Sequence, residues 1–411
     1  MSTMGGCQPA PAAETNWQFQ FRRIVILSAI VLIYFLQGEI RFLPSPLMED
    51  LAADFAVPLT TVGNLLSLCM VAAAISMFGV SVVVEKVGSV NMLIISAVCV
   101  AVSGCVSFAA RNFAVILLAY LFCGICQGIM ECIGVVLVAQ LFSSNYRALF
   151  CSLICAVSQI TSSIAYSLPV FLEEPLGGWR HLELLWGILA VGVAVLVFFF
   201  GGRKMLEKAQ EKKQGAEKIG LLGALRMRFI VLSVLTMVVF IWVNNHYAIY
   251  LPTYLAEVKG FSKEQAGLGT SLMYICGFIG ALVSGALSVK FRKSIYRYTP
   301  MFMLAGSLIL CLFQTPFLVL LGAGLFACAY QMWIPMALAS FMNLDGVSTA
   351  VLAGATALFN GSGHFLTGFI PTVFTWELQF MSMHTAYLIT SCLLLISVVL
   401  VLAASSLKEF Q

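Results

Sequence analysis

The stretch FAVILLAYLFCGICQGIMECIGVVLVAQL, residues 113–141, contains a single charged residue, Glu131. A helix needs about 20 mostly apolar residues to cross the hydrocarbon core of a bilayer. This stretch exceeds that length without a proline or a second charge, so it predicts a membrane-spanning helix. Similar apolar runs recur along the whole chain.

The composition extends this prediction to the entire protein. Hydrophobic residues make up 61% of the 411 residues and charged residues only 10%, and the mean hydropathy is +1.00. So little polar surface cannot cover a water-soluble globule of this size. The sequence therefore predicts an all-α integral membrane protein with the lipid bilayer as its solvent, and a chain of this length holds roughly twelve spanning helices.

The apolar runs, bounded by charges, Pro and Gly, fall into two sets of six. The first set is expected at 24–47, 59–84, 90–109, 113–141, 149–171 and 182–201, and the second at 229–251, 264–289, 297–314, 316–341, 349–373 and 381–404. We therefore predict twelve transmembrane helices in two six-helix bundles.

The polar segments define the remaining domain boundaries. The predicted organisation is an N-terminal tail at 1–23, a first bundle at 24–201, a charged central loop at 202–228, a second bundle at 229–404 and a C-terminal tail at 405–411. Most Lys and Arg residues lie in the tails, the central loop and the loops on the same side of the membrane. By the positive-inside rule, both termini and the central loop are expected to be cytoplasmic, in a plasma (inner) membrane.

The two halves share weak internal similarity. Leu43-Pro44 at the end of the first helix corresponds to Leu251-Pro252 at the end of the seventh, and Glu85-Lys86 corresponds to Val289-Lys290. Weak duplication around a charged middle loop indicates a carrier built from parallel repeats.

Three segments resemble motifs of the major facilitator superfamily. They are Ser81-Val82-Val83-Val84-Glu85-Lys86-Val87-Gly88-Ser89-Val90, its second-half counterpart Gly285-Ala286-Leu287-Ser288-Val289-Lys290, and Leu117 to Arg147 with Gly124, Gly128 and Phe142-Ser143-Ser144-Asn145-Tyr146-Arg147. The trailing arginines of the family's first loop are absent, and Tyr120 stands where many members carry an arginine. The resemblance implies a secondary transporter working by alternating access. It also implies that Glu85, Lys86, Gly88 and Lys290 pin the two bundles together and act as gating residues.

Three charged residues lie inside predicted helices: Glu39, Arg41 and Glu131. A charge at the bilayer centre costs about 2.5 to 3.5 kcal/mol on insertion scales, so such residues normally face a cavity and mark function. Glu39 and Arg41 are separated by about 200° on an ideal helix. We expect Pro44 and Pro46 to distort the helix so that both side chains turn toward one cavity.

The predicted roles follow from the chemistry of these groups. A guanidinium is a bidentate partner for a carboxylate, so Arg41 is expected to bind an anionic substrate. Glu39 and Glu131 are expected to carry a coupling proton. In the alternative interpretation, Arg41 only neutralises one of these glutamates and touches no substrate.

Polar residues in both halves complete the predicted site. The expected substrate-binding residues beside Arg41 are Gln37, Gln127, Gln159, Asn245, Tyr274, Gln331 and Asn360. Asn245 aligns with Gln37 in the internal repeat. Two histidines, His246 and His364, are able to titrate near neutrality, and His246 is the one we predict to take part in proton coupling.

The favoured hypothesis is proton-coupled uptake of a small organic anion, because the acid and arginine of the first helix resemble those of the superfamily's organic anion–proton symporters. The alternative is a proton-driven exporter or antiporter of an apolar or cationic small molecule. The sequence contains no nucleotide-binding loop, G-x-S-x-G motif or cluster with metal-ligand spacing. We therefore expect no enzyme activity, no cofactor, no metal and no nucleic-acid partner, and a monomer as the working unit.

Overall fold

The computed structural model describes residues 16–44, 47–62, 64–165, 168–201, 220–344, 347–367 and 369–407. Every regular element within these ranges is helical. The first half contains α1 (Asn16–Phe42), α2 (Met48–Phe55), α3 (Leu59–Val62), α4 (Asn64–Val87), α5 (Ser89–Ala109), α6 (Phe113–Leu141), α7 (Ser144–Ala165), α8 (Leu168–Leu176) and α9 (Trp179–Phe200). The second half contains α11 (Gly220–Arg226), α12 (Arg228–Glu257), α13 (Lys263–Leu312), α14 (Pro316–Met342), α15 (Thr349–Thr356), the π-helix η1 (Ala357–Gly361), α16 (Ser362–Thr367), α17 (Ile370–Glu377), α18 (Met383–Cys392) and α19 (Leu394–Ser405).

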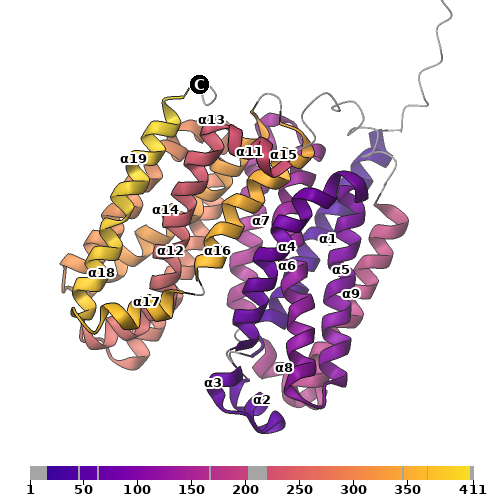
Figure 1. The fold of residues 1–411 in the computed structure, drawn as a ribbon, viewed down its shortest axis with the longest axis horizontal. Helices are drawn as coiled ribbons and strands as arrows, with labels where there is room; N and C mark the ends of the chain where they lie inside the picture. Colours follow the sequence, from indigo (N-terminus) through magenta and orange to yellow (C-terminus); the bar gives the residue numbers. More distant parts are fainter. Residues whose placement is uncertain are drawn as a thin grey trace, which may run out of the picture.

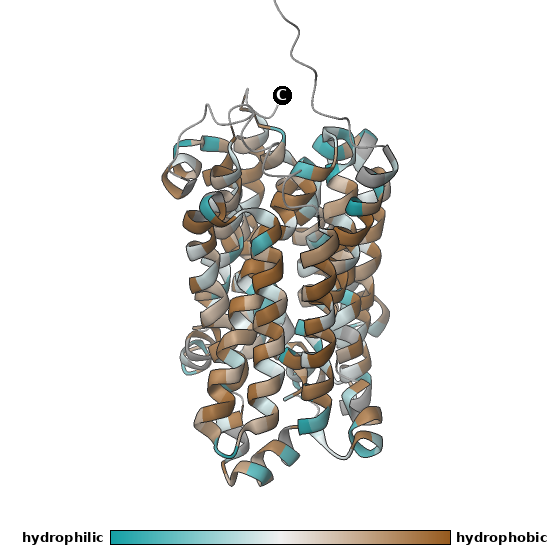
Figure 2. Cartoon of the chain, turned by 90° about the vertical axis from the view of Figure 1, so that its right-hand side faces the viewer, coloured by the Kyte–Doolittle hydropathy of each residue, from teal (hydrophilic) through white to brown (hydrophobic). Residues whose placement is uncertain are grey.

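The helices form two bundles that lie side by side, one from each half of the chain (Figure 1). Apolar residues cover the middle of the bundles, and polar residues gather toward the two ends (Figure 2). The halves touch mainly where α13 and α14 pack on α7, and where α15 and η1 pack on α4. The short helices α2, α3 and α8, by contrast, pack mainly on elements of their own half.

Several helices have the length and hydropathy of membrane spans. Nine such segments occur among the described residues, two of them within α13, and the second of these two contains a non-helical residue, Phe291, near its start. The predicted helix at 149–171 is divided between α7 and α8, and the one at 349–373 is divided among α15, η1, α16 and α17. The helical membrane fold is confirmed, and the count of twelve spans remains a prediction.

Two boundaries differ from the sequence prediction. Helix α1 begins at Asn16, inside the predicted tail, where Trp17 stacks on Phe21 at 5.6 Å and Phe21 contacts Phe200 of α9 at 6.0 Å. These aromatic contacts favour extra helical turns before the first apolar run. Helix α11 lies inside the predicted central loop and packs on α15. Residues 202–219 of that loop lie outside the described part of the chain.

Small residues set the distance between α4 and α6. A β-carbon on Gly128 would lie 1.9 Å from Ser76 Oγ and 2.3 Å from the Ala73 carbonyl oxygen. The backbones of the two helices therefore approach so closely that only glycine fits, as is common in membrane helix packing.

We expect Gly128→Ala to destabilise the protein by about 1 to 3 kcal/mol, because the added methyl group forces α4 and α6 apart. Gly192→Ala in α9 is the matched control, since nothing lies within 4 Å of a β-carbon there. That change should be neutral or slightly stabilising. Thermal unfolding of the detergent-purified variants measures the difference, and equal melting temperatures would contradict the packing argument.

Candidate transport site between the two halves

Helix α1 places its charged residues on different faces. It stays helical through Phe42, and the Leu43 N–H donates to the Glu39 carbonyl at 3.2 Å. The predicted distortion between Glu39 and Arg41 is therefore wrong. Pro44 acts at the helix C-terminus, where its missing N–H and its ring end the helix instead of bending it. Pro46 lies outside the described residues.

The Arg41 guanidinium has only weak partners. Its NH2 group lies 3.2 Å from Met70 Sδ of α4, its carbon lies 4.7 Å from the Phe42 ring centroid, and its buried Nε has no hydrogen-bond partner in the described structure. None of the carboxylates in the described ranges forms an ion pair with it. It does act electrostatically on Glu131, without contact. The arginine is thus a half-buried cation available to an anion.

Glu39 is fully buried, and neither of its carboxyl oxygens has a partner among the residues described. Phe35, one turn earlier on the same face of α1, packs edge-on against Trp186 of α9 at 6.0 Å. Glu39 therefore faces into the first half, away from Arg41. Its predicted role in proton coupling remains a prediction.

Glu131 of α6 joins the two halves. Its Oε1 accepts a hydrogen bond from Gln127 Nε2 at 3.1 Å, and its Oε2 lies 3.5 Å from His364 Nε2 of α16. Both side chains of the Glu131–His364 pair are more than four-fifths buried. This contact connects the bundles through a carboxyl group and an imidazole.

The π-helix η1 contributes to the position of His364. A π-turn contains an extra residue per turn, which shifts the following side chains around the helix axis, and it often occurs at functional sites. Element η1 contacts α4, α6 and α12, and α16 with His364 follows it directly. The predicted residue Asn360 lies within η1 and is half-buried.

The neighbours of Glu131 come from three further elements. Tyr34 of α1 and Tyr330 of α14 are buried close enough to interact electrostatically with its carboxyl group. Gln127, its hydrogen-bond donor, also accepts from the Cys69 thiol at 3.9 Å. Gln37 lies on the Arg41 face of α1, and its amide donates to Cys123 Sγ at 3.7 Å. Gln37, Arg41, Gln127 and Glu131, four of the residues predicted from sequence, thus surround one region of the first bundle.

The remaining predicted binding residues are dispersed over the interface and the second half. Gln159 and Gln331 meet at Gly277 of α13, where a β-carbon would lie 3.7 Å from Gln159 Oε1 and 3.2 Å from Gln331 Cγ. Asn245 donates to Thr367 Oγ1 at 3.2 Å and to the Ile241 carbonyl at 2.9 Å. Tyr274 is half-buried in α13. Their roles in substrate binding remain predictions.

His246 lies in a different environment from His364. Its ring packs among Phe374, Tyr387 and Tyr250 at centroid distances of 4.6, 4.9 and 5.7 Å, and neither ring nitrogen has a partner within the described ranges. It has no carboxylate beside it there. The geometry favours His364, which lies 3.5 Å from the Glu131 carboxyl group, over His246 as the histidine that takes part in proton coupling. The proton role predicted for His246 has no supporting contact.

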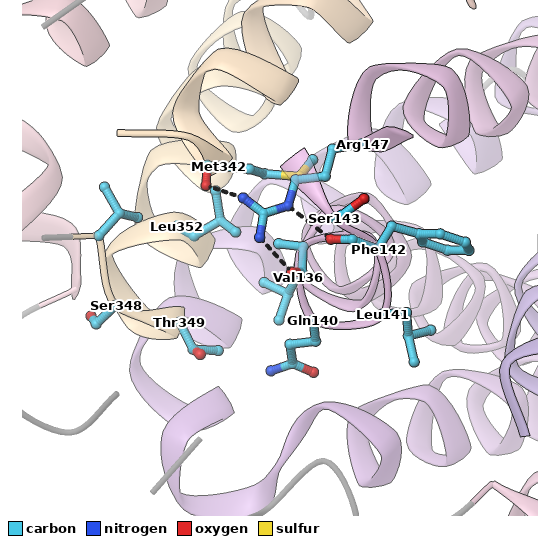
Figure 3. A pocket seen from close by; sticks show the side chains of 12 residues that line it. Val136, Gln140, Leu141, Phe142, Ser143, Arg147, Met342, Ser348, Thr349 and Leu352 are labelled. Atoms are coloured by element: carbon cyan, nitrogen blue, oxygen red, sulfur yellow. Dashed lines mark hydrogen bonds between the residues drawn. The ribbon is translucent and has the colours of Figure 1, made fainter. Parts of the chain in front are cut away.

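The bundles also meet at the end of the protein that carries α11 and α15. Here Arg147 of α7 lines a cavity of about 310 Å³ together with Gln140, Met342, Ser348 and others (Figure 3). Its guanidinium donates to the carbonyls of Ala139 and Phe142 in its own half. It also donates to the Met342 carbonyl at 2.5 Å and to Asn343 Oδ1 at 2.9 Å in the other half. Arg147 therefore fastens α14 to the α6–α7 turn.

The predicted gating residues lie in the last turn of α4, directly before α5 and within α13. Gly88 has a φ of +84°, which glycine tolerates and other residues rarely adopt, and it directly precedes α5. Lys86 and Lys290 are exposed, and the Lys290 ammonium lies 5.3 Å from the Phe291 ring. The Glu85 side chain lies outside the described part of the structure. Sequence reasoning used Arg147 only as a motif residue, although it makes two hydrogen bonds between the halves.

Two helical bundles, apolar around their middle and joined by buried polar residues, define a multi-pass membrane transporter. The chain belongs to the Major Facilitator Superfamily, whose family pattern matches residues 30–354. It is a secondary transporter of that family, and its family membership confirms the resemblance seen in the loop motifs.

Solved structures of this superfamily share the fold at low sequence identity. The proton:xylose symporter XylE is 17% identical, with a TM-score of 0.72 over 92% of this chain and 95% of that one. The transporter FucP in its outward conformation is 15% identical, with a TM-score of 0.73 over 94% and 100%. The human organic anion transporter MFSD10 is 15% identical, with a TM-score of 0.72 over 92% and 99%.

Proposed function

We propose that this protein is a proton-coupled symporter of a small organic anion, with a carboxylate as the recognised group. Arg41 binds the anion, and the Glu131–His364 pair takes up and releases the coupling proton. The observation that carries the proposal is this pair, because it joins the two bundles through a carboxyl group and an imidazole that lie 3.5 Å apart and can each exchange a proton. The plasma (inner) membrane, cytoplasmic termini and a monomeric state complete the proposal.

The substrate class follows from the state of Arg41. Its guanidinium is half-buried, and a methionine sulfur and an aromatic ring are its described contacts. Arginine stays charged at any physiological pH, and its planar donors match a carboxylate. An anion entering between the halves would provide the counter-charge that the described protein contacts do not.

The coupling argument rests on alternating access. Carriers of this type transport by rocking one bundle against the other. The contact between Glu131 in α6 and His364 in α16 must then open and close during each cycle. Protonation of Glu131 removes the negative charge that holds His364, so proton binding and bundle separation are linked. XylE, a proton:xylose symporter with the same fold, supports a proton as the coupling ion.

Uptake into proteoliposomes tests the proposal. A panel of radiolabelled carboxylates and their neutral amide or alcohol analogues is presented with and without an inward proton gradient, to the parent protein and to Arg41→Gln. We expect gradient-driven uptake of at least one carboxylate but not of its neutral analogue. Arg41→Gln should weaken its binding by about 1.5 to 3 kcal/mol, the usual contribution of a hydrogen bond to a charged group, or roughly tenfold to 150-fold in affinity.

Arg111→Gln is the matched control, because Arg111 is an exposed arginine in the turn between α5 and α6. It should transport like the parent. Uptake that is indifferent to Arg41, or efflux of an apolar or cationic compound in place of carboxylate uptake, would contradict the proposal and support the exporter alternative.

A further inference from the structure

Besides Glu39 and Glu131, the first bundle contains a third buried carboxyl group, Glu183 of α9, which plays no part in the proposed site. Its side chain is fully buried, and no cation in the described part of the chain forms an ion pair with it. An ionised carboxylate without a counter-charge is very costly to bury, so such a group is normally neutral. Its described contacts show how it is stabilised.

The close oxygen–oxygen contacts around Glu183 show whether its carboxyl group carries a proton. The Tyr120 hydroxyl of α6 lies 3.0 Å from Glu183 Oε1 and 2.8 Å from the Ile40 carbonyl oxygen of α1. A phenol has one proton and can donate one strong hydrogen bond. With Glu183 ionised, three oxygens would share that single proton, and one close oxygen–oxygen contact would be left without it.

A protonated Glu183 resolves this conflict. Its O–H donates to Tyr120 Oη, and the Tyr120 O–H then donates to the Ile40 carbonyl. Each close pair of oxygens then has one hydrogen between them. Such a chain is cooperative, since each donor polarises the next.

The Ile40 carbonyl is free to accept because of Pro44. In a regular helix the N–H of residue 44 would donate to it, and proline has no N–H. The carbonyl is next to Arg41 in the chain, at the last turn of α1. The hydrogen-bond chain thus connects a carboxyl group of α9 through α6 to the backbone beside the residue proposed to bind the anion.

We propose that Glu183, Tyr120 and the Ile40 carbonyl form a proton-binding site within the first bundle, occupied in this conformation and separate from the Glu131–His364 pair. Loss of the proton would leave a carboxylate that competes with Ile40 for the Tyr120 hydroxyl. The end of α1 would then lose its partner on α6. Proton binding at Glu183 therefore fixes the position of the last turn of α1, whatever the transported substrate is.

Few other titratable groups face Glu183. Helix α5 presents the Ser107 hydroxyl close to its carboxyl group, and α6 presents Tyr120. Helix α1 carries Glu39 beside Ile40. On α9 itself, Arg180 is one turn away, but its guanidinium is directed to Asp54 and to the Ala110 carbonyl. The site thus has carboxyl and hydroxyl groups and no described cation that would compensate an ionised Glu183.

Infrared spectroscopy of the purified protein in lipid nanodiscs tests the proposal without any transport assay. The C=O stretch of a protonated carboxylic acid is distinct from the bands of a carboxylate. We expect the parent-minus-Glu183→Gln difference spectrum to contain an acid band at neutral pH. In Tyr120→Phe this band should shift to higher frequency, because the acid loses its hydrogen-bond acceptor. Glu174→Gln, an exposed carboxyl group on α8, is the control and should remove only carboxylate bands.

Stability against pH gives an independent readout. A carboxyl group that is protonated when folded and ionised when unfolded stabilises the fold at low pH, and this stability is lost as the pH rises through the range in which the folded protein releases the proton. The parent should therefore lose melting temperature as the pH is raised, and Glu183→Gln, whose amide can still donate to Tyr120, should lose less. A difference spectrum with only carboxylate bands at neutral pH, or identical pH profiles for parent and variant, would overturn the proposal.

Discussion

Glu131→Gln is expected to abolish proton-driven accumulation of the substrate while substrate exchange continues. The glutamine keeps the size of the side chain and a hydrogen bond to Gln127, but it cannot bind a proton or carry the negative charge that attracts a protonated His364. One co-transported proton across a gradient of about one pH unit provides about 1.4 kcal/mol, enough for about tenfold accumulation. In the variant the inside-to-outside substrate ratio should fall to about one.

Two further variants make this prediction specific to the pair. His364→Gln removes the partner of Glu131 and should also uncouple transport from the gradient. Glu174→Gln, which neutralises an exposed carboxylate on α8, should accumulate substrate like the parent. The assay is uptake and counterflow in proteoliposomes at fixed pH gradients. Tenfold accumulation by Glu131→Gln would show that the coupling proton is carried elsewhere.

The fold could be predicted from sequence because bilayer crossing imposes strong local requirements. The run at 113–141 alone predicts a spanning helix, and α6 has the same bounds, Phe113–Leu141. The loop motifs around Gly88 and Arg147 resemble those of the superfamily, and the chain belongs to it. These signals depend on residues close together in the sequence, so no three-dimensional information is needed to read them.

The site was less predictable because its contacts connect distant parts of the chain. Glu131 and Arg41 could be singled out as charges in apolar runs, but the partner of Glu131 could not. His246 and His364 are both histidines in apolar helices, and only the packing of α16 against the first bundle distinguishes them. The effect of Pro44 was also predicted wrongly, because a proline near the end of a helix can either end the helix or bend it. Its neighbour Tyr120 of α6 provides a hydrogen bond to the Ile40 carbonyl, which Pro44 leaves without its helical donor.

A second large effect is expected at Arg147, which fastens the two bundles at the end carrying α11 and α15. Two of its four hydrogen bonds cross between the halves, to the Met342 carbonyl and to Asn343. Hydrogen bonds from a charged group contribute about 1.5 to 3 kcal/mol each. Arg147→Ala should therefore shift the balance toward a conformation separated at this end by at least about 3 kcal/mol, or roughly hundredfold.

Hydrogen–deuterium exchange measures this shift directly, because amides at the end of α14 and in α15 exchange when the bundles separate. Exchange of residues 340–344 and 347–352 should accelerate strongly in Arg147→Ala and less in Asn343→Ala, which removes one of the two crossing bonds. Exchange in Arg147→Lys should be closer to that of Arg147→Ala than to that of the parent. The donors of an ammonium are all on one nitrogen, so they cannot reach the four oxygens to which the planar guanidinium donates. Arg111→Ala, at an exposed turn of the first half, should leave exchange unchanged. If Arg147→Ala exchanged like the parent, the separation of the halves would be controlled by other contacts, and the packing of α15 on α4 would be the next to test.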